Sequence, residues 1–143
     1  MRLTKREGTV SLRELDALWA ESCREAVAGP PVAKLRLADA IYSVHRGGDG
    51  SLIAVETQLD GGGSVAFRGD IAVGDPARGR AVIFGGLDPG TTLDEIAADA
   101  NAAVKLDVGD GGYVAVIPYV QGASVVVRRR RGALVQDSRV DIA

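Results

Sequence analysis

Apolar residues recur with helical spacing near the start of the chain. The stripe runs through Leu12, Leu15, Trp19, Cys23 and Ala26. Ser11 and Glu14 form a capping box at its beginning, and Gly29 followed by two prolines stops it. The pattern predicts an N-terminal helix with a buried apolar face, and it places Trp19 and Cys23 in the core.

From Val32 onward, apolar and polar residues alternate with the period of two that is typical of strands. Turn-forming residues divide this region at positions 46–50, 60–64 and 75–79. We therefore predict an antiparallel meander of about four strands that ends near Phe84. The alternation changes phase near residues 38–40, which indicates a bulge or a break there. A single strand is expected to contain both Val65 and Val73.

After Phe84 comes a glycine-rich turn and then a second capped stripe. Thr92 and Glu95 form another capping box. The residues of the stripe are Leu93, Ile96, Ala100 and Val104. We predict a second helix from Thr92 to about Leu106, lying on the sheet. Two or three antiparallel strands follow, at residues 113–120, 124–130 and 133–142. Pro118 cannot donate to a ladder, so the first of them is expected at a sheet edge or beside a bulge.

Together these elements predict one α+β domain over residues 1–143. Its order is a helix, a meander of about four strands, a second helix, and two or three C-terminal antiparallel strands. Helices that do not alternate with strands argue against a doubly wound fold. Aromatic residues make up only 4% of the 143 residues, so the core must be aliphatic and offers few stacking platforms for bases or sugars.

The sequence also limits where the protein works. Cys23 is the single cysteine, so no intramolecular disulfide forms. The basic start lacks the apolar stretch of a signal peptide, and no run approaches the length of a membrane-spanning helix. We expect a soluble protein without membrane contact, either cytoplasmic or, if it is a phage component, part of a virion.

Charge is segregated along the chain. Both ends are net basic, and residues 85–127 are net acidic. The strongest feature is a run of four arginines, Arg128, Arg129, Arg130 and Arg131, which are the candidate partner-binding residues. On a strand they would alternate between two faces, and their place before Gly132 predicts the end of a hairpin. Three interpretations stay open: an acidic protein partner, nucleic-acid phosphates, or a solvated hairpin. The pI near 5.4 disfavours nucleic acid.

Motifs that carry chemistry are weak. Residues 85–92, from Gly85 to Thr92, have the glycine spacing of a phosphate-binding loop but lack its lysine, so an ordinary turn is expected. The single histidine, His45, is predicted to be a surface turn residue without metal-binding companions. Asp107 and Asp110 lack the spacing of a calcium loop. Residues 68–70 spell an adhesion tripeptide inside a predicted strand, which we attribute to chance.

These observations favour a non-enzymatic structural or assembly protein that acts through protein–protein contacts. It would be a subunit of a homo-oligomer or larger assembly, for example a virion or tail component. The first alternative is a regulatory module that binds a small ligand or nucleic acid. The second is an enzyme whose polar residues converge only in the fold, with Asp39, Tyr42 and His45 as the candidates. We predict no catalytic, metal-binding or cofactor-binding residue from the sequence itself.

Overall fold

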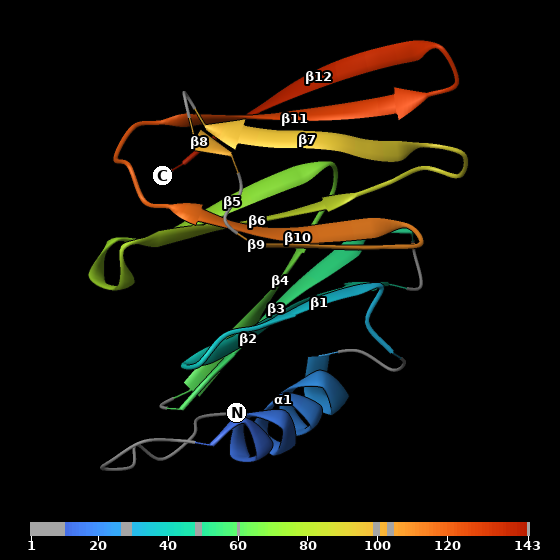
Figure 1. Cartoon of the computed structure of the whole chain (residues 1–143). Coiled ribbons are helices and arrows are strands. Elements are labelled where there is room, and N and C mark those ends of the chain that lie inside the picture. Colours follow the sequence, from blue (N-terminus) through green and yellow to red (C-terminus); the bar gives the residue numbers. More distant parts are fainter. Residues whose placement is uncertain are drawn as a thin grey trace.

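The computed structural model describes residues 11–26, 30–47, 50–59, 61–98, 101–102 and 105–142. Within these residues, one helix and twelve strands form four stacked layers (Figure 1). Helix α1 (Leu12–Ala26) covers one face of the first of three antiparallel sheets. The protein is therefore broadly α+β, but it is mostly antiparallel sheet.

Each sheet contains four strands. Sheet A has the order β1 (Ala33–Arg36), β2 (Ala40–Arg46), β3 (Leu52–Gln58) and β4 (Gly61–Phe67). Sheet B has the order β5 (Asp70–Asp75), β6 (Arg80–Gly86), β10 (Gly112–Pro118) and β9 (Lys105–Gly109). Sheet C has the order β12 (Leu134–Asp141), β11 (Ser124–Arg131), β7 (Thr92–Ala98) and β8 (Asn101–Ala102).

The predicted N-terminal helix is confirmed. The Glu14 backbone N–H donates to the Ser11 side-chain oxygen at 3.1 Å, as the capping box requires. Leu15 is fully buried against sheet A, and the Trp19 indole N–H donates to Ser43 Oγ at 3.0 Å. The side chain of Cys23 lies outside the described residues, so its predicted burial stays a prediction.

The meander is confirmed in type but contains six strands rather than four, and they lie in two sheets. The phase change near residues 38–40 is a tight turn, in which the Leu37 N–H donates to the Ala40 carbonyl at 2.8 Å. The strand expected to hold both Val65 and Val73 is split by a turn at Gly69, whose φ of +78° favours glycine. That turn carries the chain from sheet A into sheet B, and it contains Arg68 and Gly69 of the tripeptide predicted to lie in a strand, while Asp70 begins β5.

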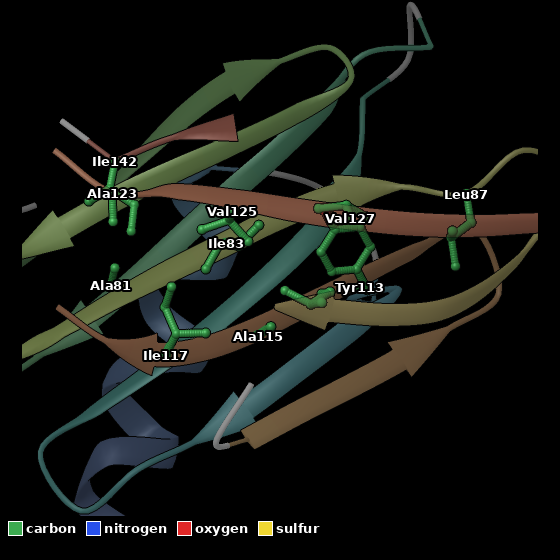
Figure 2. Close-up of a cluster of buried hydrophobic side chains, with 11 residues drawn as sticks. Ala81, Ile83, Leu87, Tyr113, Ala115, Ile117, Ala123, Val125, Val127 and Ile142 are labelled. Atoms are coloured by element: carbon green, nitrogen blue, oxygen red, sulfur yellow. The ribbon is translucent and has the colours of Figure 1, made fainter. Parts of the chain in front are cut away.

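Sheet B is the central layer and is buried on both faces. One apolar cluster lies between sheets A and B and includes Tyr42, Val44, Phe84 and Val114. The other lies between sheets B and C, where Ile83, Tyr113 and Ile117 meet Val125 and Val127 (Figure 2). This two-sided burial explains why β6 and β10 read as continuous apolar runs rather than alternating ones.

The second helix was wrongly predicted, because residues 92–98 form strand β7. Leu93 pairs with Arg129 and Glu95 with Arg128, so Asp94 is an extra residue in a β-bulge. The bulge places Leu93 and Ile96, three positions apart, on the same core-facing side. A bulged strand thus has the i, i+3 spacing of a helical stripe. Predicted helix residues Ala100 and Val104 lie outside the described residues.

Pro118 was also misplaced by the sequence prediction. Strand β10 is central, between β6 and β9, and not an edge. Pro118 is its last residue and pairs with Arg80 of β6, and among the described residues the pairing with β9 ends at Val116. The two strands predicted after it are present as β11 and β12.

Candidate functional site

Sheets A and B are joined tightly along one side. The Lys34 backbone N–H of β1 donates to Asp107 Oδ2 of β9 at 2.8 Å. A side chain at Gly109 of β9 would overlap the carbonyl oxygen of Val32, so glycine is required for this close approach. Asp107, which resembled a calcium ligand only loosely, therefore links two sheets.

On the opposite side, at edge strands β4 and β5, the two sheets stand apart. A cleft of about 220 Å³ opens there and extends between the sheets as far as Tyr42 and Phe84. Val65 of β4 and Val73 of β5 lie in its lining and are 43% and 41% exposed. Apolar side chains of this size on two neighbouring edges form a candidate contact surface.

The cleft exists because β4 supplies glycine where a side chain would otherwise fill the space. Gly63 pairs with Glu56 of β3, and Val65 pairs with Ala54, both toward sheet B. A Cβ added at Gly63 would meet no atom of the described residues within 4 Å. The packing of this chain therefore leaves open space beneath Gly63.

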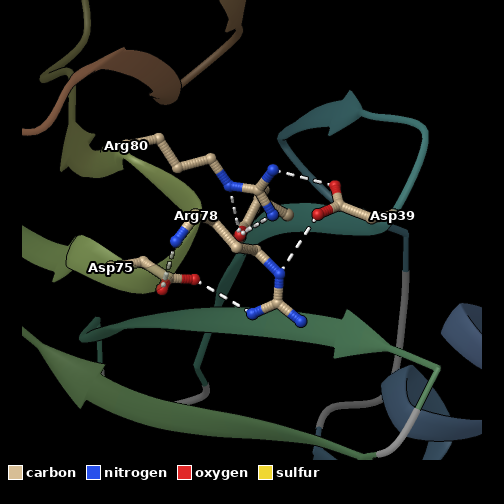
Figure 3. A network of polar contacts seen from close by, with 5 residues as sticks. Asp39, Asp75, Arg78 and Arg80 are labelled. Carbon is tan, nitrogen blue, oxygen red and sulfur yellow. Dashed lines mark hydrogen bonds and ion pairs between the residues drawn. The ribbon is translucent and has the colours of Figure 1, made fainter.

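A polar network stabilises the end of the cleft at Tyr42 (Figure 3). Arg80 donates to the Tyr42 hydroxyl at 2.8 and 3.1 Å and pairs with Asp39 at 2.8 Å. Arg78 bridges Asp39 at 3.1 Å and Asp75 at 3.0 Å. The network ties the β1–β2 turn to the 3₁₀ turn η1 (Pro76–Arg78) between β5 and β6.

Charges in this network are matched. Burial raises the pKa of Tyr42, although the hydrogen bonds from Arg80 oppose the shift, so the phenol stays protonated at neutral pH. Burial would raise the pKa of Asp39, but its hydrogen bond and charge interaction with Arg80 outweigh burial and lower it. The arrangement suits a structural clamp, because the shifts of Tyr42 and Asp39 both move their pKa values away from neutral pH.

Glu56 is the carboxylate that lines the cleft. Its burial, and then the charge of Asp75, raise its pKa, while a hydrogen bond from Gln58 and the charges of Arg78 and Arg80 act in the opposite direction. The cleft is therefore apolar over most of its wall, with one half-buried acid beneath the glycine segment.

Strand β4 is the outer strand of sheet A on this side. Its seven residues, GGGSVAF, contain no charge and no proline, and five of them are exposed. Its pairing with β3 is continuous, without a bulge. The other edge strands that the structure describes carry charges or are very short: β1, β5, β9 and β12 contain charged residues, and β8 has two residues.

The predicted partner-binding residues lie at the end of β11. Arg128 and Arg130 point to the outer face of sheet C, where they pair with Asp137 and Asp94 at 2.9 Å each. Arg129 points inward and pairs with Asp70, which also accepts from the Tyr113 hydroxyl. The alternation and the hairpin are confirmed. Binding of an acidic partner by Arg128–Arg131 stays a prediction, and such a partner would compete with these pairs.

His45 is not the surface turn residue that its sequence position predicted. It is buried beneath α1, with its Nε2 at 2.9 Å from Ser43 Oγ and its ring stacked on Trp19. Tyr42 lies on the other face of β2, so Asp39, Tyr42 and His45 do not converge. No cluster of three or more metal-ligating side chains occurs among the described residues.

The glycine-rich segment at residues 85–92 runs from the end of β6 to the start of β7 and contains a turn, in which the Thr91 N–H donates to the Asp88 carbonyl at 2.9 Å. A strand follows it, so the helix N-terminus that an anion site would need is missing. Nearby lies a more polar cleft of about 340 Å³ that sequence reasoning missed. Two of its arginines are engaged within the chain: Arg129 with Asp70, and Arg46 with the Gly111 carbonyl.

No described helix is long and apolar enough to cross a membrane. Comparison of the chain with protein-family models, curated proteins and solved structures finds no match. Function must therefore be inferred from the geometry of the described residues. Among their features, the β4 edge with its adjoining cleft is best suited to contact with another molecule.

Proposed function

We propose that this protein is a non-enzymatic assembly subunit that associates with copies of itself through strand β4. The observation that carries the proposal is the uncharged, bulge-free edge of β4, five of whose seven residues are exposed. An edge strand presents unpaired backbone N–H and C=O groups, which can hydrogen-bond to a strand from another molecule.

The contrast with the other described edges supports this choice. Charged side chains on edge strands oppose unwanted pairing, and β12 carries Asp137, Arg139 and Asp141. Strand β9 is held against β1 by the Asp107 contact. Strand β4 has neither charged side chains nor such a contact, although it is one of the longer edge strands. A role as a virion or tail component is a narrower version of the same proposal.

Ligand binding is the second candidate function, favoured by the apolar cleft beside β4. A small apolar molecule would occupy the same space that self-association would cover. The nucleic-acid version depends on Arg128, Arg129 and Arg130, whose charges already have acidic partners within the chain. Self-association uses both the β4 edge and the cleft, so we place it first.

Light scattering of the purified protein over a range of concentrations tests the proposal. A pairing of two seven-residue strands is small beside a standard interface of roughly 1,600 Å², so the mass should rise with concentration in the micromolar range. Ser64→Lys places charge on the exposed edge and should hold the protein at monomer mass. Val135→Lys adds the same charge to β12 and should leave association unchanged. A wild-type protein that stays monomeric throughout would refute the proposal.

A further inference from the structure

We infer that two β4 strands pair antiparallel across a two-fold axis at Ser64, so that two copies form one continuous eight-stranded sheet from their A sheets. The inference rests on the proposed self-association and specifies its geometry. It follows from the order of large and small residues along β4.

Residue sizes along β4 are self-complementary in one orientation. Three glycines, Gly61, Gly62 and Gly63, precede Ser64, and Val65, Ala66 and Phe67 follow it. Antiparallel pairing centred on Ser64 places every larger side chain opposite a glycine of the other copy. Parallel pairing in register would instead set Phe67 against Phe67 and glycine against glycine. Aromatic and β-branched side chains packed across from glycine compensate for the missing glycine side chain.

The pairing also explains the cleft. Residues directly opposite in an antiparallel pair share a face of the sheet. The partner's Val65 would therefore lie beside Gly63 on the face toward sheet B, at the mouth of the cleft. By symmetry, Val65 of this chain would occupy the same place in the partner. The exposure of Val65 in the single chain is what this arrangement would remove.

Gly62 and Gly63 of β4 differ in a way that supports a side chain from a second copy beside Gly63. A side chain at Gly62 would overlap the Glu56 carbonyl oxygen, so packing within the chain requires glycine there. At Gly63 a Cβ meets nothing, and its φ is not in the left-handed region. Packing among the described residues of one chain thus gives no reason for glycine at 63, whereas a neighbouring valine from a second copy does.

Disulfide cross-linking tests the register. In the proposed dimer two Ser64 residues face each other, close enough for a bridge after Ser64→Cys. Under mild oxidation this variant should form covalent dimers in excess of the wild type, which has only Cys23, and mass spectrometry should locate the 64–64 link. Val135→Cys on β12 is the matched control and should give no such excess. An oligomeric protein without the 64–64 link would overturn the inference but leave self-association intact.

A residue swap tests the packing independently. Gly63→Val puts a side chain where the partner's Val65 should lie, and should weaken association at least about tenfold. Combining it with Val65→Gly exchanges the two positions and restores the size match, so association should recover. Circular dichroism and thermal melting confirm that each variant is folded. Association that is unaffected by Gly63→Val, or that the swap fails to restore, would contradict the register even where the wild type is oligomeric.

Discussion

At the scale of residues, position on a strand decides whether an arginine forms a buried or an exposed ion pair. Arg129 and Arg130 are neighbours of the same type, yet Arg129 lies inward with a side chain 14% exposed, and Arg130 lies outward at 49%. Arg129 binds Asp70, which is 8% exposed, and donates to the Gly86 carbonyl. The pKa of Tyr113 is raised, first by burial and then by the neighbouring Asp70 charge.

We therefore expect Arg129→Ala to lower the free energy of unfolding by about 3 kcal/mol, because it leaves Asp70 buried without its counter-charge. Arg130→Ala removes an exposed pair and should cost less than about 1 kcal/mol. Chemical denaturation of both variants measures the difference. Equal losses would contradict the structural distinction between the two arginines.

Glu56 should make stability depend on pH. Because burial raises its pKa in the folded state, the folded protein disfavours the ionised form relative to the unfolded chain. This penalty is absent at pH values below the ordinary value of 4.5 and develops as the pH rises through and above it. Glu56→Gln should therefore gain stability relative to the wild type between about pH 4 and neutral pH. A constant difference across this range, measured by denaturation, would contradict the assignment.

Single-residue patterns could not predict the site. The alternation of Arg128 to Arg131 was visible in the sequence and is confirmed. The burial of His45 was not, because it depends on α1 folding back over sheet A to bring Trp19 onto the ring. Likewise, Arg80 meets Tyr42 and Asp39 only through the stacking of two sheets. The uncharged sequence GGGSVAF was the available signal for β4, but its glycines also predict a turn.

At the scale of elements, local patterns predicted α1 and the C-terminal hairpin but not β7. The cap and the apolar stripe of α1 depend on residues within the helix itself, so the local sequence is enough to predict it. In β7 the bulge at Asp94 produces the spacing of a helix, and the partner strand β11, about 30 residues further on, decides the outcome. The glycine-rich start of β4 was expected to be a turn, because strand pairing with β3 is also non-local.

Docking of α1 on sheet A predicts a strong contrast between two leucines of the same helix. Leu15 is fully buried and Leu12 is 50% exposed. Leu15→Ala should lower the free energy of unfolding by about 2–5 kcal/mol, because it leaves a cavity beneath the helix. Leu12→Ala should change it by less than about 0.5 kcal/mol. If both substitutions had the same small effect by thermal or chemical unfolding, the helix would not be packed on the sheet.

At the scale of the whole molecule, the three sheets share two apolar clusters, and sheet B belongs to both, while α1 packs on sheet A. The A–B pair is closed at β1 and β9 by contacts within the chain. It is open at β4 and β5, where Gly63 leaves a cleft and Val65 is exposed. This asymmetry is the basis of the proposed assembly, in which β4 of a second copy pairs with β4 on the open side.

Amide hydrogen exchange of residues 61–67, followed at low and at high protein concentration, tests the central claim most directly. Outward-facing amides of an unpaired edge exchange quickly, and pairing with a second strand protects them. We predict that protection of β4 increases with concentration, while protection of the charged edge strand β12 does not, and that Ser64→Lys abolishes the increase. Exchange of β4 that is fast and independent of concentration in a self-associating sample would contradict assembly through this edge.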